Sequence, residues 1–317
     1  MGSHLTLAAA VFPVFLLLAI GAGVRRWHWL QSAADETLMN LVVKILYPCL
    51  ILSAILGNPA VERMENLLVA PVLGGLTVLL GFAVAALALP ALRAPSPAAA
   101  RTFVFTVGLF NYGYLPIPIV QQLFDRETLG VLLLFNVGVE IAFWTAGILL
   151  LTGISPLKGW KQILNPPVIA LFTALILNFT GLAAHLPEPL LRTVGLLGGC
   201  AIPLGLLLIG ATLFDSTRAV KGAERLRWRV PLIACCVRLG VLPPLFLLLA
   251  LLLPISLELQ RVLLIQAAMP AAIFPIVIAR HYGGHPETAL AVVLGTTLVS
   301  LLTIPIWLSL GKLWLGL

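Results

Sequence analysis

The sequence repeats one pattern from end to end: an apolar run, then a short joint rich in Pro, Gly and charged residues. Each run is close to the roughly 20 residues that a helix needs to cross the hydrocarbon core of a bilayer. With 61% hydrophobic and 10% charged residues, the chain is unlike a soluble domain. It predicts an all-α integral membrane protein with ten transmembrane helices. We place them at 5–24, 38–56, 67–90, 102–121, 128–151, 166–184, 192–214, 230–253, 260–280 and 288–311.

Basic residues gather on one side of this predicted topology. The joints after the odd-numbered spans hold twelve Lys and Arg residues, and the opposite side holds five. The positive-inside rule then puts both termini outside the cytoplasm. We therefore interpret the net charge of +7 as an orientation signal of a multi-pass protein of the cell inner membrane, with no nucleic-acid partner. The largest basic cluster is Arg218, Lys221, Arg225, Arg227 and Arg229.

No motif of an enzyme or of a metal site is present. The four cysteines lie inside apolar runs without the spacing of zinc ligands or of a disulfide framework. The sequence contains no HExxH, no GxSG serine motif, no paired intramembrane aspartates and no P-loop. We expect no enzymatic activity, no metal and no cofactor.

Proline landmarks recur in the same order in the two halves of the chain. Each half contains five predicted spans, so the second half enters the membrane from the opposite side. We predict two inverted repeats, 1–153 and 166–317, joined by a short cytoplasmic linker at 154–165. Many secondary transporters have this architecture, with the substrate near the midplane. The matching prolines are Pro13 with Pro167, Pro48 with Pro203, Pro71 with Pro231, and Pro116 with Pro275.

The fourth and ninth predicted spans are interrupted in mid-membrane, at 111–118 and 269–275. An interior proline costs a helix about 3 kcal/mol, so two nearby interruptions predict unwound backbone. Such backbone must be buried in protein or line a wet cavity. The N-termini of the half-helices can then face an anion. The alternative is that these prolines only kink the helices.

The same residues carry a family resemblance. The motifs are Asn-Tyr-Gly-x-Leu-Pro at 111–116, Asn-Pro-Pro at 165–167, Pro203 with the run 209–213, and Met269-Pro270 followed by Tyr-Gly at 282–283. Together they resemble the auxin efflux carrier family, which includes the plant PIN proteins and bacterial carriers of dicarboxylates such as malonate. The resemblance covers almost the whole chain. It implies ten spans in two inverted repeats, with the fourth and ninth crossing at their proline breaks, and often a homodimer. The long cytoplasmic loop of the plant PIN proteins is absent here.

The candidate substrate site is this predicted crossing. Asn136, in the fifth span, corresponds to an asparagine that similar carriers place beside it. An interhelical hydrogen bond is the alternative role for Asn136. The candidate substrate-binding residues are Asn111, Tyr112, Gly113, Pro116, Asn136, Met269, Pro270 and Pro275.

Few ionisable residues lie deep in the predicted spans, where a charge costs about 2.5–3.5 kcal/mol. Glu140 is a candidate for coupling to protons; alternatively it is a neutral acid or forms a buried pair with Lys44 or Arg238. Lys44 is a second coupling candidate, although it and Arg238 lie close enough to the cytoplasmic ends to snorkel toward water. For Arg238, Asn178 and Gln266 we expect structural roles.

These observations predict a secondary active transporter, an efflux carrier of small organic anions such as carboxylates or auxin-like acids. It would work by alternating access at the crossing of spans four and nine. Two alternatives stay open: a cation- or sodium-coupled carrier with a related crossed-helix fold, and a non-transporting membrane sensor. The exact substrate, the direction of transport, the coupling ion and the oligomeric state are not determined by the sequence.

Overall fold

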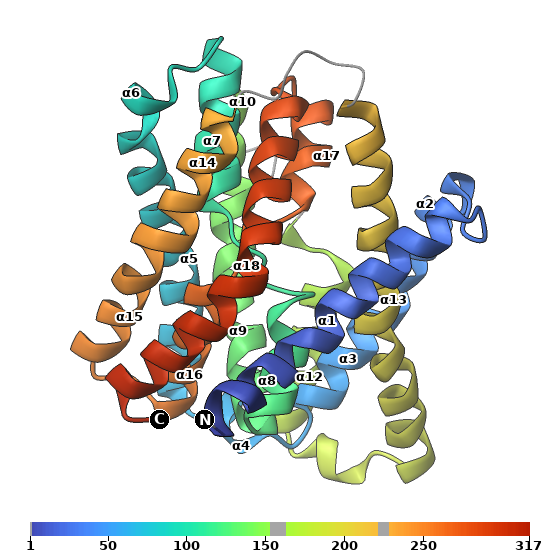
Figure 1. Cartoon of the computed structure of the whole chain (residues 1–317). Coiled ribbons are helices and arrows are strands. Elements are labelled where there is room, and N and C mark those ends of the chain that lie inside the picture. Colours follow the sequence, from blue (N-terminus) through green and yellow to red (C-terminus); the bar gives the residue numbers. More distant parts are fainter. Residues whose placement is uncertain (1, 153–162, 221–227) are drawn as a thin grey trace.

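The computed structural model describes residues 2–152, 163–220 and 228–317, and within these ranges the chain is helical without a β-strand (Figure 1). Seven helical segments in the described ranges are long and apolar enough to cross a membrane. The protein is therefore an all-helical, multi-pass membrane protein. The seven segments are Ala9–Arg26, Ser32–Ile55, Met64–Leu87, Arg126–Thr152, Glu188–Arg218, Arg229–Leu252 and Pro286–Leu315.

The other three predicted spans are not continuous long helices. The fourth consists of α7 (Pro97–Gly108) and α8 (Pro116–Leu123), and the ninth of α16 (Leu257–Ala268) and α17 (Phe274–His281). The sixth is α12 (Pro166–Phe179), whose 14 residues measure about 21 Å at 1.5 Å per residue. This is shorter than the roughly 30 Å hydrocarbon core. Residues 154–162 of the predicted linker, and Lys221, Arg225 and Arg227 of the basic cluster, lie outside the described residues.

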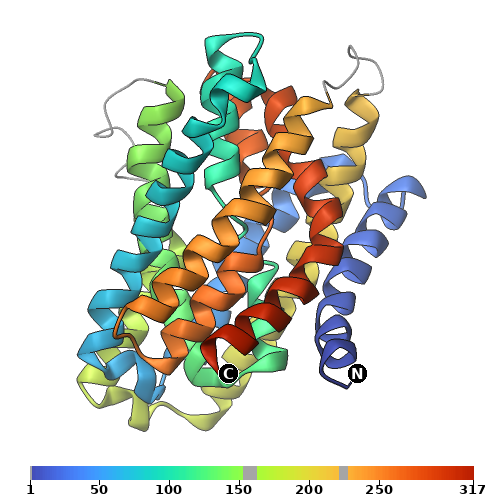
Figure 2. The same ribbon diagram turned by 60° about the vertical axis from the view of Figure 1, so that its left-hand side comes forward.

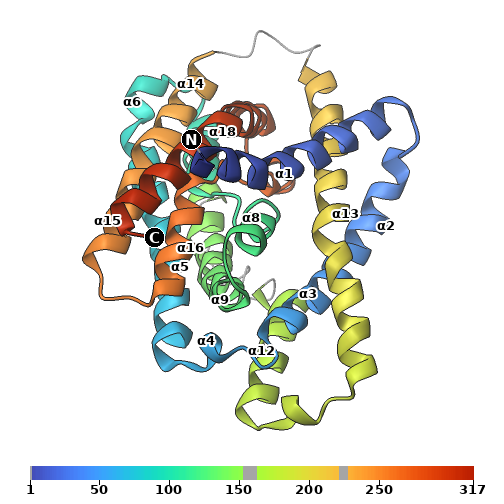
Figure 3. The same ribbon diagram turned by 60° about the horizontal axis from the view of Figure 1, so that its bottom comes forward.

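The helices of the described residues form two packed groups, which the view of Figure 3 separates. In the first group α13 packs against α1 and α3, and α12 packs against α3. In the second group α9 packs against α5 and α16, and α18 packs against α14, α16 and α7. The bounds of the remaining helices are α1 Gly2–Arg26, α2 Asp35–Leu41, α3 Tyr47–Ile55, α4 Pro59–Glu62, α5 Met64–Leu87, α6 Leu89–Leu92, α9 Arg126–Ala142, α10 Ile148–Thr152, α13 Glu188–Val220, α14 Arg229–Cys235, α15 Leu242–Leu252 and α18 Pro286–Leu315.

Side-chain caps set where several of these helices begin. Asn165 accepts a hydrogen bond from the Val168 N–H at 3.0 Å and so starts α12. Ser96, Asp125 and Ser256 cap α7, α9 and α16 in the same way. Each cap satisfies an N–H group that the first turn of a helix leaves unpaired.

Within the described parts of the chain, three spans contain a π-helical turn. These turns are η2 (Val42–Leu46), η3 (Phe143–Gly147) and η6 (Cys236–Val241). A π-turn inserts an extra residue into the helical repeat and is frequent at functional sites. Here η3 contains Trp144 and η6 contains Arg238, both of which contact the interior region described below.

Both termini lie at the same end of the molecule, and the helices run between its two ends (Figures 1 and 2). Large apolar side chains such as Phe12, Leu87, Leu302 and Leu313 are exposed on the outside of the bundle. A soluble monomer rarely exposes so much apolar surface, whereas hydrocarbon solvates it without cost.

Glycines let paired helices approach closely in both groups. A Cβ on Gly138 of α9 would lie 1.6 Å from the Pro71 carbonyl oxygen of α5. In the first group, a Cβ on Gly210 of α13 would lie 2.1 Å from the Leu18 carbonyl oxygen of α1. Such contacts are typical of membrane helices, which associate by packing because lipid offers no hydrophobic driving force between them.

The Gly138→Ala substitution should destabilise the protein. Its methyl group would overlap the α5 backbone, and overpacking of this kind costs about 1–3 kcal/mol. We expect the melting temperature in detergent to fall by about 5 °C. The matched control is Gly199→Ala in α13, where a Cβ meets nothing within 4 Å, so its melting should not fall. Equal melting of the two variants would contradict the close contact between α5 and α9.

Candidate functional site

The two helix interruptions lie side by side and bond to each other. The Asn111 N–H donates to the Pro270 carbonyl oxygen at 2.8 Å, and the Ala272 N–H donates to the Leu109 carbonyl oxygen at 2.9 Å. The pairing is antiparallel. Backbone groups that the broken helices release are therefore satisfied by one another, as an apolar environment demands. These two N–H groups are occupied and are not free donors in this conformation.

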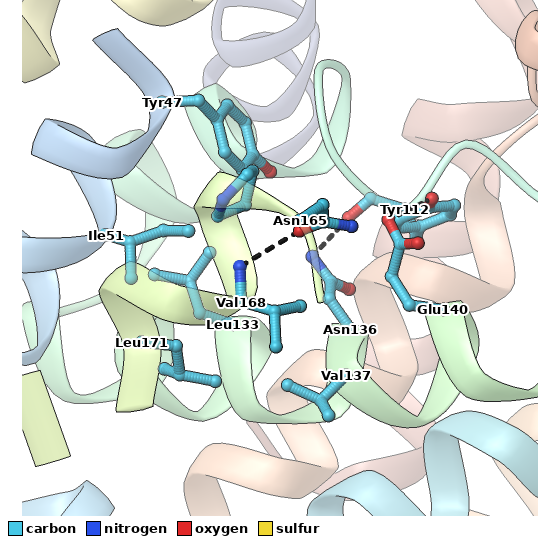
Figure 4. Close-up of a pocket in the computed structure, with 11 residues that line it drawn as sticks. Tyr47, Ile51, Tyr112, Leu133, Asn136, Val137, Glu140, Asn165, Val168 and Leu171 are labelled. Carbon is cyan, nitrogen blue, oxygen red and sulfur yellow. Dashed lines mark hydrogen bonds between the residues drawn. The ribbon is translucent and has the colours of Figure 1, made fainter. Parts of the chain in front are cut away.

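A cavity of about 40 Å³ lies between the two helix groups (Figure 4). A water molecule needs roughly 10–15 Å³, so the cavity has room for a few waters or a very small solute. One wall comes from α3 and the start of α12, and the other from α9 and the first interruption. The lining residues are Tyr47, Ile51, Tyr112, Leu133, Asn136, Val137, Glu140, Asn165, Pro167, Val168 and Leu171.

Glu140 contributes the carboxyl group of this cavity, and its partners are neutral. Its Oε1 accepts a hydrogen bond from the Tyr112 hydroxyl at 2.8 Å, and its Oε2 accepts one from the Trp144 indole N–H at 3.0 Å. None of the ion pairs in the described ranges includes Glu140. The alternative of a buried pair with Lys44 or Arg238 is therefore absent. Lys44 is exposed on η2 and does not line the cavity.

An amide network ties the cavity to the second interruption. The Asn136 Nδ2 donates to the Tyr112 carbonyl oxygen at 2.8 Å. Gln266, from α16, donates from Nε2 to the same carbonyl and to the Asn136 Oδ1, both at 3.4 Å. Gln266 is completely buried. Its side chain therefore links α16 to both α9 and the first interruption, which is a structural role as expected, with partners that the sequence did not indicate.

Arg238 lies beside this network, and the expectation that it snorkels toward water is wrong. Its relative exposure is 0%. Its Nε donates to the Met269 carbonyl oxygen at 2.9 Å, and its Nη2 donates to those of Gln266 and Ala267 at 3.1 and 3.2 Å. The orphan carbonyls at the end of α16 attract it, and these lie inside the protein. An arginine inside an apolar run was the signal available in the sequence.

The predicted site residues fall into two sets. Tyr112, Asn136 and Glu140 meet at the cavity (Figure 4). Asn111 is buried, and its Oδ1 accepts the Leu115 N–H at 3.3 Å, where it helps start α8. Like Asn111, the remaining predicted residues do not line the cavity in this conformation: Gly113, Pro116, Met269, Pro270, Pro275 and Lys44.

Two polar residues that line the cavity, Tyr47 and Asn165, were not among the predicted site residues. Tyr47, in α3, points its hydroxyl oxygen at the first interruption, 3.2 Å from where a Cβ on Gly113 would lie. The glycine therefore leaves space for this tyrosine. Asn165 was noted only in a motif, yet it lines the cavity at the start of α12. The role of both residues depends on contacts between distant segments.

Comparison with known proteins identifies the family. The model of the family described as membrane transport protein matches residues 6–155 and 151–308, and so covers nearly the whole chain. The protein belongs to this family, that of the auxin efflux carriers. It is therefore a member of a family of membrane transporters, as expected from its motifs, and not of a family of enzymes.

Two archaeal relatives align over almost their full length. An uncharacterized transporter of Methanothermobacter thermautotrophicus is 25% identical over 305 residues, which is 94% of this chain and 96% of the relative. An uncharacterized transporter of Methanocaldococcus jannaschii is 26% identical over 304 residues, with the same coverage. Neither name specifies a substrate.

The hydrogen bond from Tyr112 should control the reactivity of Glu140. A donor to a carboxylate favours the ionised form, so Tyr112→Phe should leave more of the Glu140 population protonated. Dicyclohexylcarbodiimide attacks protonated carboxyl groups, and mass spectrometry should show Glu140 modified about fivefold faster in this variant. The matched control is Tyr114→Phe, whose hydroxyl contacts the Met39 sulfur instead. Equal rates in the two variants would contradict the assigned hydrogen bond.

Proposed function

We propose that this protein is a secondary active transporter that moves small organic anions, carboxylates above all, by alternating access. The observation that carries the proposal is the position of the cavity. It lies between the two helix groups, contains the carboxyl group of Glu140, and borders the paired interruptions through Tyr112. Transporters place their substrates where broken helices meet near the midplane.

The proposed architecture has ten transmembrane spans in two inverted repeats, 1–153 and 166–317. The pairs α7–α8 and α16–α17 are its fourth and ninth spans and cross at their interruptions. The antiparallel hydrogen bonds between residues 109–111 and 270–272 support this arrangement. The common end of the two termini agrees with an even number of spans (Figure 1). We further propose that both termini face away from the cytoplasm of the inner membrane and that two copies form a homodimer.

Alternating access follows from motion of one helix group against the other. Tyr47 and Val168 belong to the first group, and Tyr112, Asn136 and Glu140 belong to the second. A shift between the groups would separate the cavity walls at one end and then at the other. Substrate binding would bias which of these states is populated, because it contacts both walls.

We propose that the anion is held between the two interruptions. Tyr112 and Asn136 already line the cavity, and the N–H groups of the interruptions would become donors when their mutual bonds open. Backbone N–H groups at helix N-termini are suited to this role. The proposed substrate-binding residues are Asn111, Tyr112, Gly113, Pro116, Asn136, Met269, Pro270 and Pro275.

The direct test is uptake into proteoliposomes. A panel of radiolabelled acetate, malonate, succinate, benzoate and indole-3-acetate, together with radiolabelled sodium and a small organic cation, would be offered under a pH gradient and, separately, under a sodium gradient. We expect saturable uptake of at least one carboxylate, driven by the pH gradient. Uptake of cations only, or binding without flux, would reject the proposal. The first outcome would favour a cation carrier and the second a membrane sensor.

Glu140→Gln should separate exchange from accumulation. We propose that Glu140 carries the coupling proton, since it lines the cavity and its partners Tyr112 and Trp144 are neutral, so no cation among the described residues pairs with it. The glutamine keeps the shape but does not titrate. We expect exchange of the transported carboxylate across the membrane to continue while accumulation driven by the pH gradient is lost.

The matched control for this prediction is Glu62→Gln, which changes an exposed carboxylate of α4 and should accumulate substrate normally. A stable Glu140→Gln protein with wild-type accumulation would eliminate the coupling role. Lys44→Met, tested in parallel, should accumulate substrate normally if Lys44 only faces the lipid headgroups.

A further inference from the structure

Arg238 is a completely buried cation without a carboxylate partner. None of the ion pairs formed by the described residues includes it. Its hydrogen bonds go to backbone carbonyl oxygens alone, and Nη1 has no hydrogen-bond partner. Its guanidinium carbon lies 5.2 Å from the ring centres of both Phe110 and Phe246. Neutral groups therefore surround the positive charge.

The end of α16 balances only part of this charge. The C-terminal carbonyls of a helix are equivalent to about half a negative charge. A guanidinium carries a full positive charge at any pH that the protein meets. The aromatic faces attract the cation but carry no net charge. A net positive charge of about one half is left on the guanidinium and the end of α16 taken together.

Ending a broken helix does not require such a cation. The half-helix α7 ends at Gly108, in the first interruption, and no charged side chain in the described ranges bonds to its last carbonyls. The two interruptions are otherwise paired by equivalent backbone bonds. The charge at Arg238 is therefore not needed to end α16. Because a charge in an apolar interior costs free energy, we expect this one to have a function.

The contacts of Arg238 lead directly to the candidate substrate site. It binds the carbonyl of Gln266, whose side chain donates to Tyr112 and Asn136 at the cavity. It also binds the carbonyl of Met269, the residue before the one that pairs with the first interruption. The guanidinium therefore binds beside two sets of contacts. One is the pair of hydrogen bonds from the Gln266 side chain, and the other is the backbone pairing at Pro270.

We propose that Arg238 is the fixed positive charge that makes the cavity select anions. It is a positioning residue, because it acts through its field and through the end of α16 and does not line the cavity. In low-dielectric surroundings such a field reaches the cavity with little screening. This role rests on the proposed function, because it makes an anionic carboxylate the transported substrate.

Charged thiol reagents can measure this field without knowledge of the substrate. The test starts from the full-length protein with its four cysteines replaced by alanine, into which Val137→Cys places a single thiol at the cavity wall (Figure 4). The readout is the ratio of its reaction rates with an anionic and a cationic methanethiosulfonate reagent. Thr180→Cys, on an exposed position beyond α12 in the first group, is the matched control position.

We expect Arg238→Met to lower the rate ratio at position 137 about tenfold and to leave the ratio at position 180 unchanged. Arg238→Lys should keep the ratio near neutral pH, because it keeps the charge. A lysine at this buried position can lose its proton as the pH rises, whereas an arginine cannot. The ratio of Arg238→Lys should therefore fall between pH 7 and pH 9 relative to the protein with Arg238 over the same range.

The lysine variant keeps the proposal testable even if Arg238→Met does not fold, because one folded protein is compared in two charge states. A folded Arg238→Met protein with an unchanged ratio would overturn the proposal. A ratio in Arg238→Lys that follows the Arg238 protein across the pH range would overturn it as well. Failure of the proposed transport would instead appear as absent carboxylate uptake by proteoliposomes, with the reagent ratio unaffected.

Discussion

Backbone in the interior of a membrane protein must find hydrogen-bond partners within the protein, and this constraint organises the structure. Two helices are broken by prolines, and each break releases backbone groups that lipid cannot satisfy. The two breaks satisfy each other, since the N–H groups of Asn111 and Ala272 donate to the carbonyl oxygens of Pro270 and Leu109. The two breaks must therefore lie side by side, and the elements that carry them are held in one group.

The candidate site is a consequence of this contact. With the interruptions joined, Tyr112 is presented to α9, where Asn136 and Glu140 bind its carbonyl and its hydroxyl. The other wall is supplied by the group of α1, α3, α12 and α13, of which α12 is too short to span the core and starts at the cavity. Internal packing of each group is tight at its glycines, and the cavity lies on the boundary between the groups.

The distribution of charge in this region is unusual for a membrane interior. Glu140 contacts the first interruption and Arg238 contacts the second, and these two side chains do not pair with each other. Glu140 is bound by a hydroxyl and an indole, and Arg238 by carbonyls and aromatic faces. A direct ion pair would have neutralised both groups. Neutral partners instead bind each of the two groups, so neither one neutralises the other.

The sequence alone determined that this is a membrane protein, its helical class, its family and the location of both interruptions. These are local properties: hydrophobic run length, proline position and ordered motifs. It also pointed to Tyr112, through the motif of the first interruption, and to Asn136 and Glu140, because polar residues stand out in an apolar span; all three line the cavity. The tertiary structure alone decided that Arg238 turns inward, that Gln266 connects α16 to the first interruption, and that Tyr47 reaches Gly113. Each of these depends on which unpaired carbonyl group, amide group or open space lies nearest to the side chain. Segments far apart in the sequence provide these partners.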